Sequence, residues 1–270
     1  MIEQIVYAEQ LGFDTVWLPE HHFSPGDGYN PAPLTFAAAI AARTKKIKIG
    51  TWLLLLPLHH ALEVAEQAAI IDIISDGRLI LGLGLGYRKE EYEAFGVSRK
   101  HRASRMEEGL EVIRKALGTE QFSFSGRHYD LKDASVYPKP VQQPGPPIWV
   151  AGNSKAAMKR AARYADAWHP VRPTLEFLVE AKADLNRYLE EESRNPESHA
   201  LALKLPLVVE NEASGTKLPT RGRPADIAAA IEGYRELGAS HFVFDLVPEE
   251  LTTTLDTMEQ FAQEIRPRLS

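Results

Sequence analysis

The sequence contains no cysteine among its 270 residues. This absence excludes a disulfide scaffold, a thiolate metal site and catalysis by a cysteine nucleophile, and it agrees with a reducing cytoplasm. An excess of positive charge is also missing, because 31 lysines and arginines are set against 37 acidic residues. The resulting net charge of −6 gives no electrostatic reason to expect a nucleic-acid partner.

Long apolar runs are absent as well. The most apolar stretch, Trp52–Leu58, is much shorter than the ~20 residues that a membrane-spanning helix needs. The N-terminus has no basic segment followed by an apolar core, which a secretion signal would show. We therefore expect a soluble, cytoplasmic protein that does not associate with membranes.

Short apolar runs alternate along the chain with segments of helical periodicity. Continuous apolar runs are typical of strands that are covered on both faces in a parallel sheet. The predicted strands are Thr15–Leu18, Ile47–Leu53, Leu79–Leu85, Pro147–Ala151, Ala165–Trp168, Leu203–Val209 and His241–Leu246. The predicted helices are Ile2–Leu11, 33–43, Ala61–Ile74, Ala103–Leu117, 154–164, 174–193, 225–237 and 249–265. This series predicts either an open doubly wound sheet or a closed eight-fold barrel.

Two intervals interrupt the regular series. The interval 87–146 separates two consecutive strands and holds a helix, a predicted hairpin at Phe122–Tyr129 and a proline-rich return. It is too small to bury a core alone, so we interpret it as a rim insertion in a single domain spanning 1–270. The interval 211–224 is rich in Gly, Pro, Ser and Thr and is predicted to be a mobile loop. The series contains seven strands and opens on a helix, so one strand of an eight-fold barrel is missing from it.

Side chains that can move protons follow the first predicted strand. Functional groups collect at strand ends in parallel α/β folds, and Glu20, His21 and His22 stand at such an end. Histidine suits proton transfer because its pKa lies near neutrality. A surface histidine beside a capping glutamate is the alternative. A metal site is disfavoured, because adjacent residues of an extended segment point to opposite sides.

Glycines end another predicted strand. Gly84 and Gly86 belong to an alternating run that lets a backbone or a planar ligand approach closely. The run is not the dinucleotide-binding fingerprint, because Tyr87 and Lys89 stand where its third glycine would fall. This difference favours the barrel over the open sheet.

A third strand end leads into a helix. Gly152, Asn153 and Ser154 precede the helix predicted at 154–164, whose first N–H groups could bind a phosphate. Ser154 would also serve as an ordinary N-cap, so both interpretations stay open.

Taken together, five stretches of the chain resemble the luciferase-like flavin oxidoreductases, the family of bacterial luciferase, alkanesulfonate monooxygenase and the F420-dependent reductases. The stretches are GFDTVWLPEHHF (12–23), KIKIGTWLLLLPLHH (46–60), AEQAAIIDIISDGRLILGLGLGYRKEEYEAFG (65–96), YPKPVQQPGPPIWVAGNSKAA (137–157) and RAARYADAWHP (160–170). The resemblance implies a TIM (β/α)8-type barrel, here without its first strand, that binds FMN or coenzyme F420 at its C-terminal face.

The resemblance also implies roles for single residues. His21 matches the family's active-site histidine, and Trp52–Leu53 matches a pair joined by a non-proline cis peptide bond, against which the flavin ring packs. His60 matches a histidine in the following loop, and the segment 152–154 matches the phosphate-binding segment. We thus expect His21 to be catalytic and no metal to be bound. The expected cofactor-binding residues are Trp52, Leu53, His60, Gly84, Gly86, Gly152, Asn153 and Ser154.

The chain departs from the family pattern at two positions. Leu85 stands where some FMN-dependent members carry an arginine that binds the phosphate, which leaves F420 open as the cofactor. Tyr87 stands where the sugar-phosphate dehydrogenase branch has a catalytic glutamate, which argues against that branch.

The resemblance thus predicts a monooxygenase that uses reduced FMN and oxygen on a small organic substrate, with a flavin reductase as a possible partner and a homodimer as its assembly. Three alternatives stay open. They are F420-dependent hydride transfer, a non-catalytic flavin-binding protein, and a metal-dependent hydrolase that uses Glu20, His21 and His22.

Overall fold

The computed structural model describes residues 1–23, 30–212, 220–246 and 250–269. The chain divides into two compact units. Unit 1 holds Met1, Glu3–Phe13 and Ala151–Ser270, and unit 2 holds Ile2 and Asp14–Val150. Among the described residues, no helix combines the length and the apolar composition needed to cross a membrane.

A parallel sheet forms the centre of unit 2. Strand β1 (Thr15–Leu18) pairs with β2 (Lys48–Thr51), β2 with β4 (Leu79–Gly84), and β4 with β7 (Ile148–Ala151). A short strand, β3 (Leu54–Leu55), runs beside the end of β4. All six residues of β4 are buried, which explains why its sequence is a continuous apolar run.

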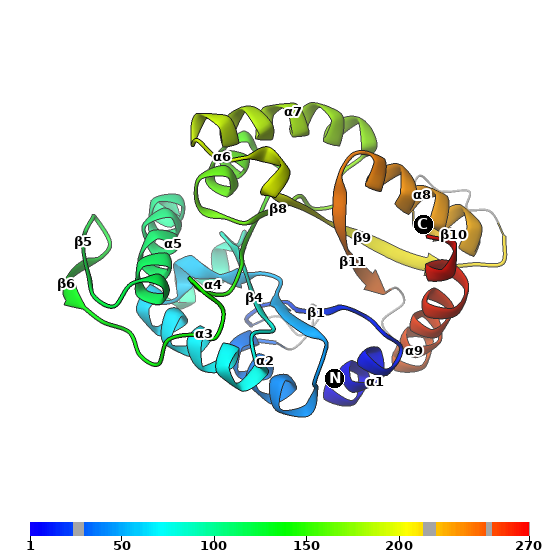
Figure 1. The fold of residues 1–270 in the computed structure, drawn as a ribbon, viewed down its shortest axis with the longest axis horizontal. Helices are drawn as coiled ribbons and strands as arrows, with labels where there is room; N and C mark the ends of the chain where they lie inside the picture. The colour runs from blue at the N-terminus through cyan, green and yellow to red at the C-terminus, as the bar shows by residue number, and fades with distance from the viewer. Residues whose placement is uncertain (24–29, 213–219, 247–249, 270) are drawn as a thin grey trace. The chain divides into compact units, whose positions relative to one another are not determined.

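Helices and one hairpin complete unit 2. The helices are α2 (Pro33–Arg43), α3 (Ala61–Ser75), α4 (Lys89–Ala94) and α5 (Arg102–Gly118). The antiparallel hairpin joins β5 (Phe122–Ser125) to β6 (Asp130–Ala134), and Figure 1 shows it projecting beyond α5. Short 3₁₀ turns lie at Leu56–Leu58 and Arg99–His101.

Arg78 ties the loops at the N-terminal side of this sheet together. Its guanidinium donates hydrogen bonds to the carbonyl oxygens of Ala41, Thr44, Ile47 and Ser75 at 2.6–3.1 Å. It also donates to the Thr44 hydroxyl at 2.9 Å. These acceptors come from the end of α2, the turn before β2 and the end of α3, so one side chain fixes three segments.

Strand β9 (Ala200–Val209) is the shared partner of three strands in unit 1. It pairs in parallel with β8 (Ala167–His169), with β10 (Arg221–Gly222) and with β11 (Ala239–Leu246). The helices of this unit are α6 (Lys155–Tyr164), α7 (Leu175–Glu191), α8 (Pro224–Glu236) and α9 (Leu251–Gln260). Leu207, Ile227, Ile231, Phe261 and Ile265 form part of their common core.

Unit 1 brings the two ends of the chain together. Helix α1 (Ile2–Gln10) lies beside α9 in Figure 1, and the Tyr7 hydroxyl donates a hydrogen bond to Glu259. The Phe13 ring stacks on Phe261 at 5.6 Å. Arg266 donates to the carbonyl oxygens of Leu11 and Gly12 at 2.8 and 2.9 Å.

The structure corrects the predicted elements in several places. All seven predicted strands are present, but the run 47–53 breaks after Thr51 and resumes as β3, because Trp52 and Leu53 stand outside the ladder. The sequence did not reveal β10 or α4, and the last predicted helix changes to a π-helical turn at Phe261–Ile265. The hairpin is confirmed and reaches Ala134.

Two predictions about intervals remain untested. Residues 213–219 of the predicted mobile loop lie outside the described residues. The single-domain interpretation and the rim position of 87–146 stay predictions.

The contacts of Arg78 yield a stability prediction. Arg78→Ala is expected to lower the free energy of unfolding by about 3 kcal/mol, because bonds to charged groups contribute about 1.5–3 kcal/mol each and carbonyls in buried segments lose their donor. Urea unfolding at pH 7 measures the change. Lys115→Ala removes only an exposed pair with Glu111 and should cost less than about 0.5 kcal/mol. An equal decrease in the free energy of unfolding of the two variants would contradict the role of Arg78.

Candidate functional site

The ends of three neighbouring strands in unit 2 meet at one edge of the sheet. Because β1, β2 and β4 are parallel, their carboxyl ends share that edge. The Trp52 amide donates to the Leu18 carbonyl oxygen at 2.6 Å, which joins the first two ends. The His21 ring lies edge-on to Tyr87, which follows β4, with the ring centroids 6.1 Å apart.

The segment Trp52–Leu53 sits at the middle of this edge. Its peptide bond is cis, as the resemblance implies. Leu53 packs directly on Gly84, where an added Cβ atom would lie 2.6 Å from the Leu53 Cδ1 atom. A side chain at position 84 would therefore displace Leu53. Both Trp52 and Leu53 remain partly exposed, so they can still contact a ligand.

Gly86 is placed by backbone conformation. Its φ angle of +70° lies in the left-handed region, which glycine adopts with little strain. Gly86 and Leu85 are partly exposed, and Tyr87 is exposed over 65% of its surface. The strand thus leaves the sheet at this point with an aromatic ring facing outward.

His21 lies against a buried carboxylate. Its Nδ1 atom is 3.5 Å from the Glu91 Oε1 atom, and the Glu91 side chain is only 2% exposed. The same oxygen accepts a hydrogen bond from the His22 amide at 3.0 Å. Since the His21 side chain is 24% exposed while its Nδ1 atom is buried, the rest of the side chain carries the exposed surface.

Glu20 is the centre of a second group of side chains. The Glu20 Oε1 atom lies 2.7 Å from the Nε2 atoms of both His22 and His59. The Oε2 atom accepts from the Leu55 amide at 2.7 Å. The carboxylate is fully shielded from solvent, so every partner it has is part of the protein in this arrangement.

The surroundings of Glu20 keep it ionised. Burial alone would raise the pKa of the Glu20 carboxyl. The hydrogen bond and the charge of His59, with the bonds from Leu55 and His22, outweigh burial and lower that pKa below its ordinary value. Among the described residues, no set of three His, Asp or Glu side chains is arranged to hold a metal ion. His21 and His22 turn to different partners, as expected for adjacent residues of an extended segment.

His60 is placed apart from this group. It caps the start of α3 by its backbone and is exposed, and its ring packs edge-on against Tyr129 at 5.4 Å. The neighbouring His59 is the histidine of this pair that contacts Glu20. A role for His60 in cofactor binding stays a prediction.

The predicted phosphate-binding segment belongs to unit 1. Ser154 caps α6, since its hydroxyl oxygen accepts from the Ala157 amide at 3.2 Å. Asn153 bonds to both backbone groups of Val171, at 2.8 and 2.9 Å. Gly152 has a φ angle of +132° and donates its N–H to His169 at 3.2 Å. The Asn153 side chain thus joins two segments of unit 1, and its role in cofactor binding stays a prediction, as does binding of an anion by the first N–H groups of α6.

His169 ends β8 in a fully buried position. Burial, with smaller contributions from Lys204 and His241, lowers the pKa of His169 to about 3. The imidazole is therefore neutral at physiological pH.

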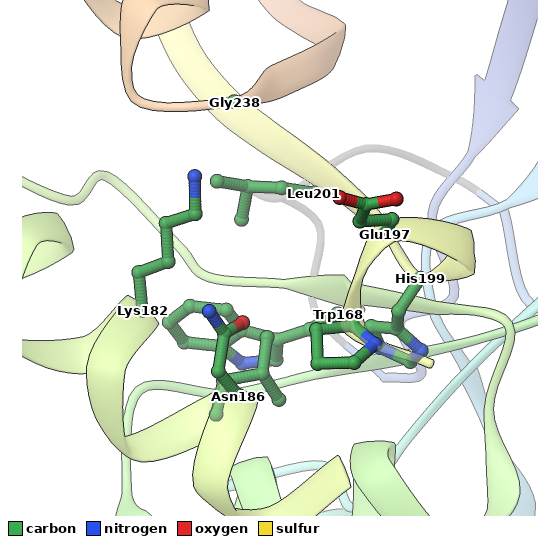
Figure 2. A pocket seen from close by; sticks show the side chains of 9 residues that line it. Trp168, Lys182, Asn186, Glu197, His199, Leu201 and Gly238 are labelled. Carbon is green, nitrogen blue, oxygen red and sulfur yellow. The ribbon is translucent and has the colours of Figure 1, made fainter. Parts of the chain in front are cut away.

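A cavity of about 460 Å³ lies at the opposite ends of the strands in unit 1. Figure 2 shows Lys182 and Asn186 of α7 on one side and Glu197 and His199 on the other. The cavity is lined where β9 and β11 begin, whereas Gly152 and His169 stand where strands end. It contains none of the predicted site residues.

Each unit has a feature that fits part of a flavin. In unit 2, the partly exposed Trp52, Leu53 and Gly86 provide an apolar surface beside the His21 imidazole, which suits a planar ring. In unit 1, the N-terminus of α6 provides N–H groups and a favourable dipole, which suit a phosphate.

Sequence reasoning missed Glu91, and of the adjacent histidines it chose His60 and not His59. Lys89, Glu90, Glu91 and Glu93 are all charged, so composition does not separate the one buried carboxylate from solvated neighbours. A helical pattern in which Tyr92 is buried next to Glu91 is the signal that could have marked this face.

Comparison with known proteins agrees with this geometry. The family model of luciferase-like monooxygenases matches residues 1–217, so the chain belongs to this family. The monooxygenase RslO1 from Streptomyces bottropensis superposes with a TM-score of 0.88 at 24% identity and covers 98% of this chain and 92% of its own. The fold is therefore the luciferase-like TIM (β/α)8-type barrel class that the sequence predicts.

Two curated relatives differ in the cofactor that their names give, F420 in one and flavin in the other. The chain is 29% identical to the F420-dependent glucose-6-phosphate dehydrogenase of Kineococcus radiotolerans, with 98% of this chain and 91% of that one covered. It is 34% identical to the oxygenase component of flavin-dependent trigonelline monooxygenase of Acinetobacter baylyi. That match covers 56% of this chain and 42% of the relative. The chain spans about half the length of several curated relatives that it matches.

The buried His169 yields a prediction about acid stability. Its folded pKa of about 3 lies below the ordinary 6.5, so the unfolded chain binds the proton first. The stability from this group is present above pH 6.5 and is lost as the pH falls towards 3. Between pH 7 and pH 5 the loss should be about 2 kcal/mol. His199, whose pKa burial lowers to about 4, acts in the same direction.

Urea unfolding of the wild type and of His169→Gln at pH 7 and pH 5 tests this. The variant should lose less stability on acidification than the wild type, by about 2 kcal/mol. An identical loss in both proteins would show that His169 is not the responsible group.

Proposed function

We propose that this chain is a flavin-dependent monooxygenase that uses reduced FMN and oxygen to oxidise a small organic substrate. The observation that carries the proposal is the meeting of His21, Trp52–Leu53 and Gly86–Tyr87 at one edge of the unit 2 sheet. When bound, reduced FMN would supply the electrons that activate oxygen. The trigonelline relative is described as an oxygenase component, which supports a separate reductase as the partner.

Different residues of the chain have different roles in this proposal. Trp52 and Leu53 present the surface on which the ring rests. In unit 1, the amides that begin α6 can bind a phosphate. His21 moves a proton between the reacting groups and solvent, because its imidazole is partly exposed and its Nδ1 atom is turned to Glu91. Glu91 orients that ring. A homodimer in the cytoplasm is the assembly and location that go with this proposal.

F420-dependent hydride transfer is the second candidate. Leu85 leaves the FMN phosphate without the arginine of some FMN-dependent members, and the full-length similarity to an F420-dependent dehydrogenase favours this version. The sugar-phosphate substrate of that relative is not expected here, because Tyr87 replaces the acidic residue. A non-catalytic flavin-binding protein is the remaining alternative, and reducible bound flavin without any turnover would support it.

Titration with each cofactor separates the first two versions. Purified protein is titrated with FMN and with F420, and quenching of cofactor fluorescence gives each Kd. A tighter Kd for FMN supports the monooxygenase, and a tighter Kd for F420 supports hydride transfer. Binding of neither cofactor would refute the proposed function.

Replacement of His21 tests its role as the proton carrier. His21→Ala should retain most of the cofactor affinity but lose about 10²–10⁴-fold in turnover, as is usual when a general base is removed. His101→Ala, at an exposed ion-dipole contact with Arg127, is the matched control and should keep wild-type turnover. Wild-type turnover in His21→Ala would remove the proposed role.

A further inference from the structure

We propose that His59 is a second acid–base residue of this site and that buried Glu20 is the positioning residue that holds its imidazole. The inference deepens the proposed function and rests on it. The family resemblance points to His60, whereas the structure points to the residue before it, because His59 contacts Glu20 and His60 contacts Tyr129.

The shared carboxylate oxygen defines the tautomer of both imidazoles. The ionised Glu20 can only accept hydrogen bonds. Its Oε1 atom lies 2.7 Å from two Nε2 atoms, those of His22 and His59. Both rings must therefore carry hydrogen on Nε2, and a neutral ring then holds its basic lone pair on Nδ1.

Exposure distinguishes the two histidines. The His22 side chain is 8% exposed, whereas that of His59 is 27% exposed. Among the described residues, the Nδ1 atom of His59 has no hydrogen-bonding partner. His59 is thus the member of the group that can meet a bound small molecule, and His22 serves to hold Glu20 in place.

The position of His59 places it near the candidate site. It follows the 3₁₀ turn Leu56–Leu58 that comes directly after β3, and β3 runs beside the carboxyl end of β4. The Leu55 amide is bonded to Glu20, which follows β1. His59 therefore stands at the same edge of the sheet as His21. The bond between Glu20 and Leu55 already joins the two segments that carry these histidines.

The group can perform a proton transfer without any further reagent. The O–H bond of a substrate hydroxyl breaks, its electron pair stays on oxygen, and a new N–H bond forms on Nδ1 of His59. The resulting imidazolium keeps its Nε2 hydrogen on Glu20, whose negative charge stabilises it. The substrate class that such a base serves is a small molecule that carries an ionisable hydroxyl group.

The charged and titratable groups around His59 come from two segments, the turn after β1 and helix α5. Glu20 contacts it directly, and His22 shares the same oxygen. From α5, Arg105 donates to the carbonyl oxygen of Pro57 at 2.8 Å. Glu20 is the acidic group in direct contact, so its removal should affect His59 more than any other single change.

Nuclear magnetic resonance of the protein labelled with ¹⁵N-histidine tests the arrangement without any cofactor. Long-range ¹H–¹⁵N spectra above neutral pH should show His22 and His59 with hydrogen on Nε2 and none on Nδ1. Glu20→Gln should turn the His59 signal into a mixture of tautomers. The opposite tautomer in the wild type would overturn the proposal.

Turnover measurements test the chemical role. His59→Gln keeps a donor towards Glu20 but cannot accept the proton, so turnover should fall about 10²-fold, while the cofactor Kd changes less than about 2-fold. In His59→Ala, added imidazole should raise turnover about tenfold, and it should not change the turnover of the wild type. The control His128→Ala removes a histidine bonded to Ser104 and should keep wild-type turnover.

The outcomes separate this inference from the function it rests on. Full turnover in His59→Gln, or the absence of rescue by imidazole in His59→Ala, would overturn the role of His59 and leave the proposed function intact. A wild-type chain that binds neither FMN nor F420 would refute the proposed function, and with it the catalytic role of His59. The tautomer measurement would then decide whether Glu20 holds the ring.

Discussion

The arrangement of the candidate site depends on one buried carboxylate. Glu20 lies at the end of β1 and is fully shielded from water, a position that a charged group tolerates only when its oxygens are bonded. Its three partners come from the same turn, from β3 itself and from the segment after β3. Because the carboxylate must keep these partners, the loop that carries His59 cannot move away from the strand end that carries His21.

A second constraint acts through packing. Leu53 fills the space that a side chain at position 84 would occupy, so the glycine in β4 and the break in the ladder after Thr51 belong to one feature. Thr51 reinforces the break by donating its hydroxyl to the Gly82 carbonyl oxygen at 2.7 Å. Polar and apolar contacts together thus define where Trp52 and Leu53 stand.

Much of the fold could be predicted from the sequence, because strands buried on both faces are apolar throughout and helices show their periodicity. The position of Trp52–Leu53 and the roles implied for His21 followed from resemblance. The choice between His59 and His60 could not be predicted, since adjacent histidines differ only in which tertiary partner they meet. Glu91 was missed for the same reason: its burial depends on the approach of α4 to the end of β1, and not on its own sequence neighbours.

The packing of α1 against α9 has a consequence for the order of folding. The hydrogen bond between Tyr7 and Glu259 joins residues 252 positions apart, and both belong to unit 1. Contacts of such long sequence separation form slowly, because the entropy of closing the intervening loop must be overcome first. The docking of α1 on α9 is therefore expected to be a late step in the folding of unit 1.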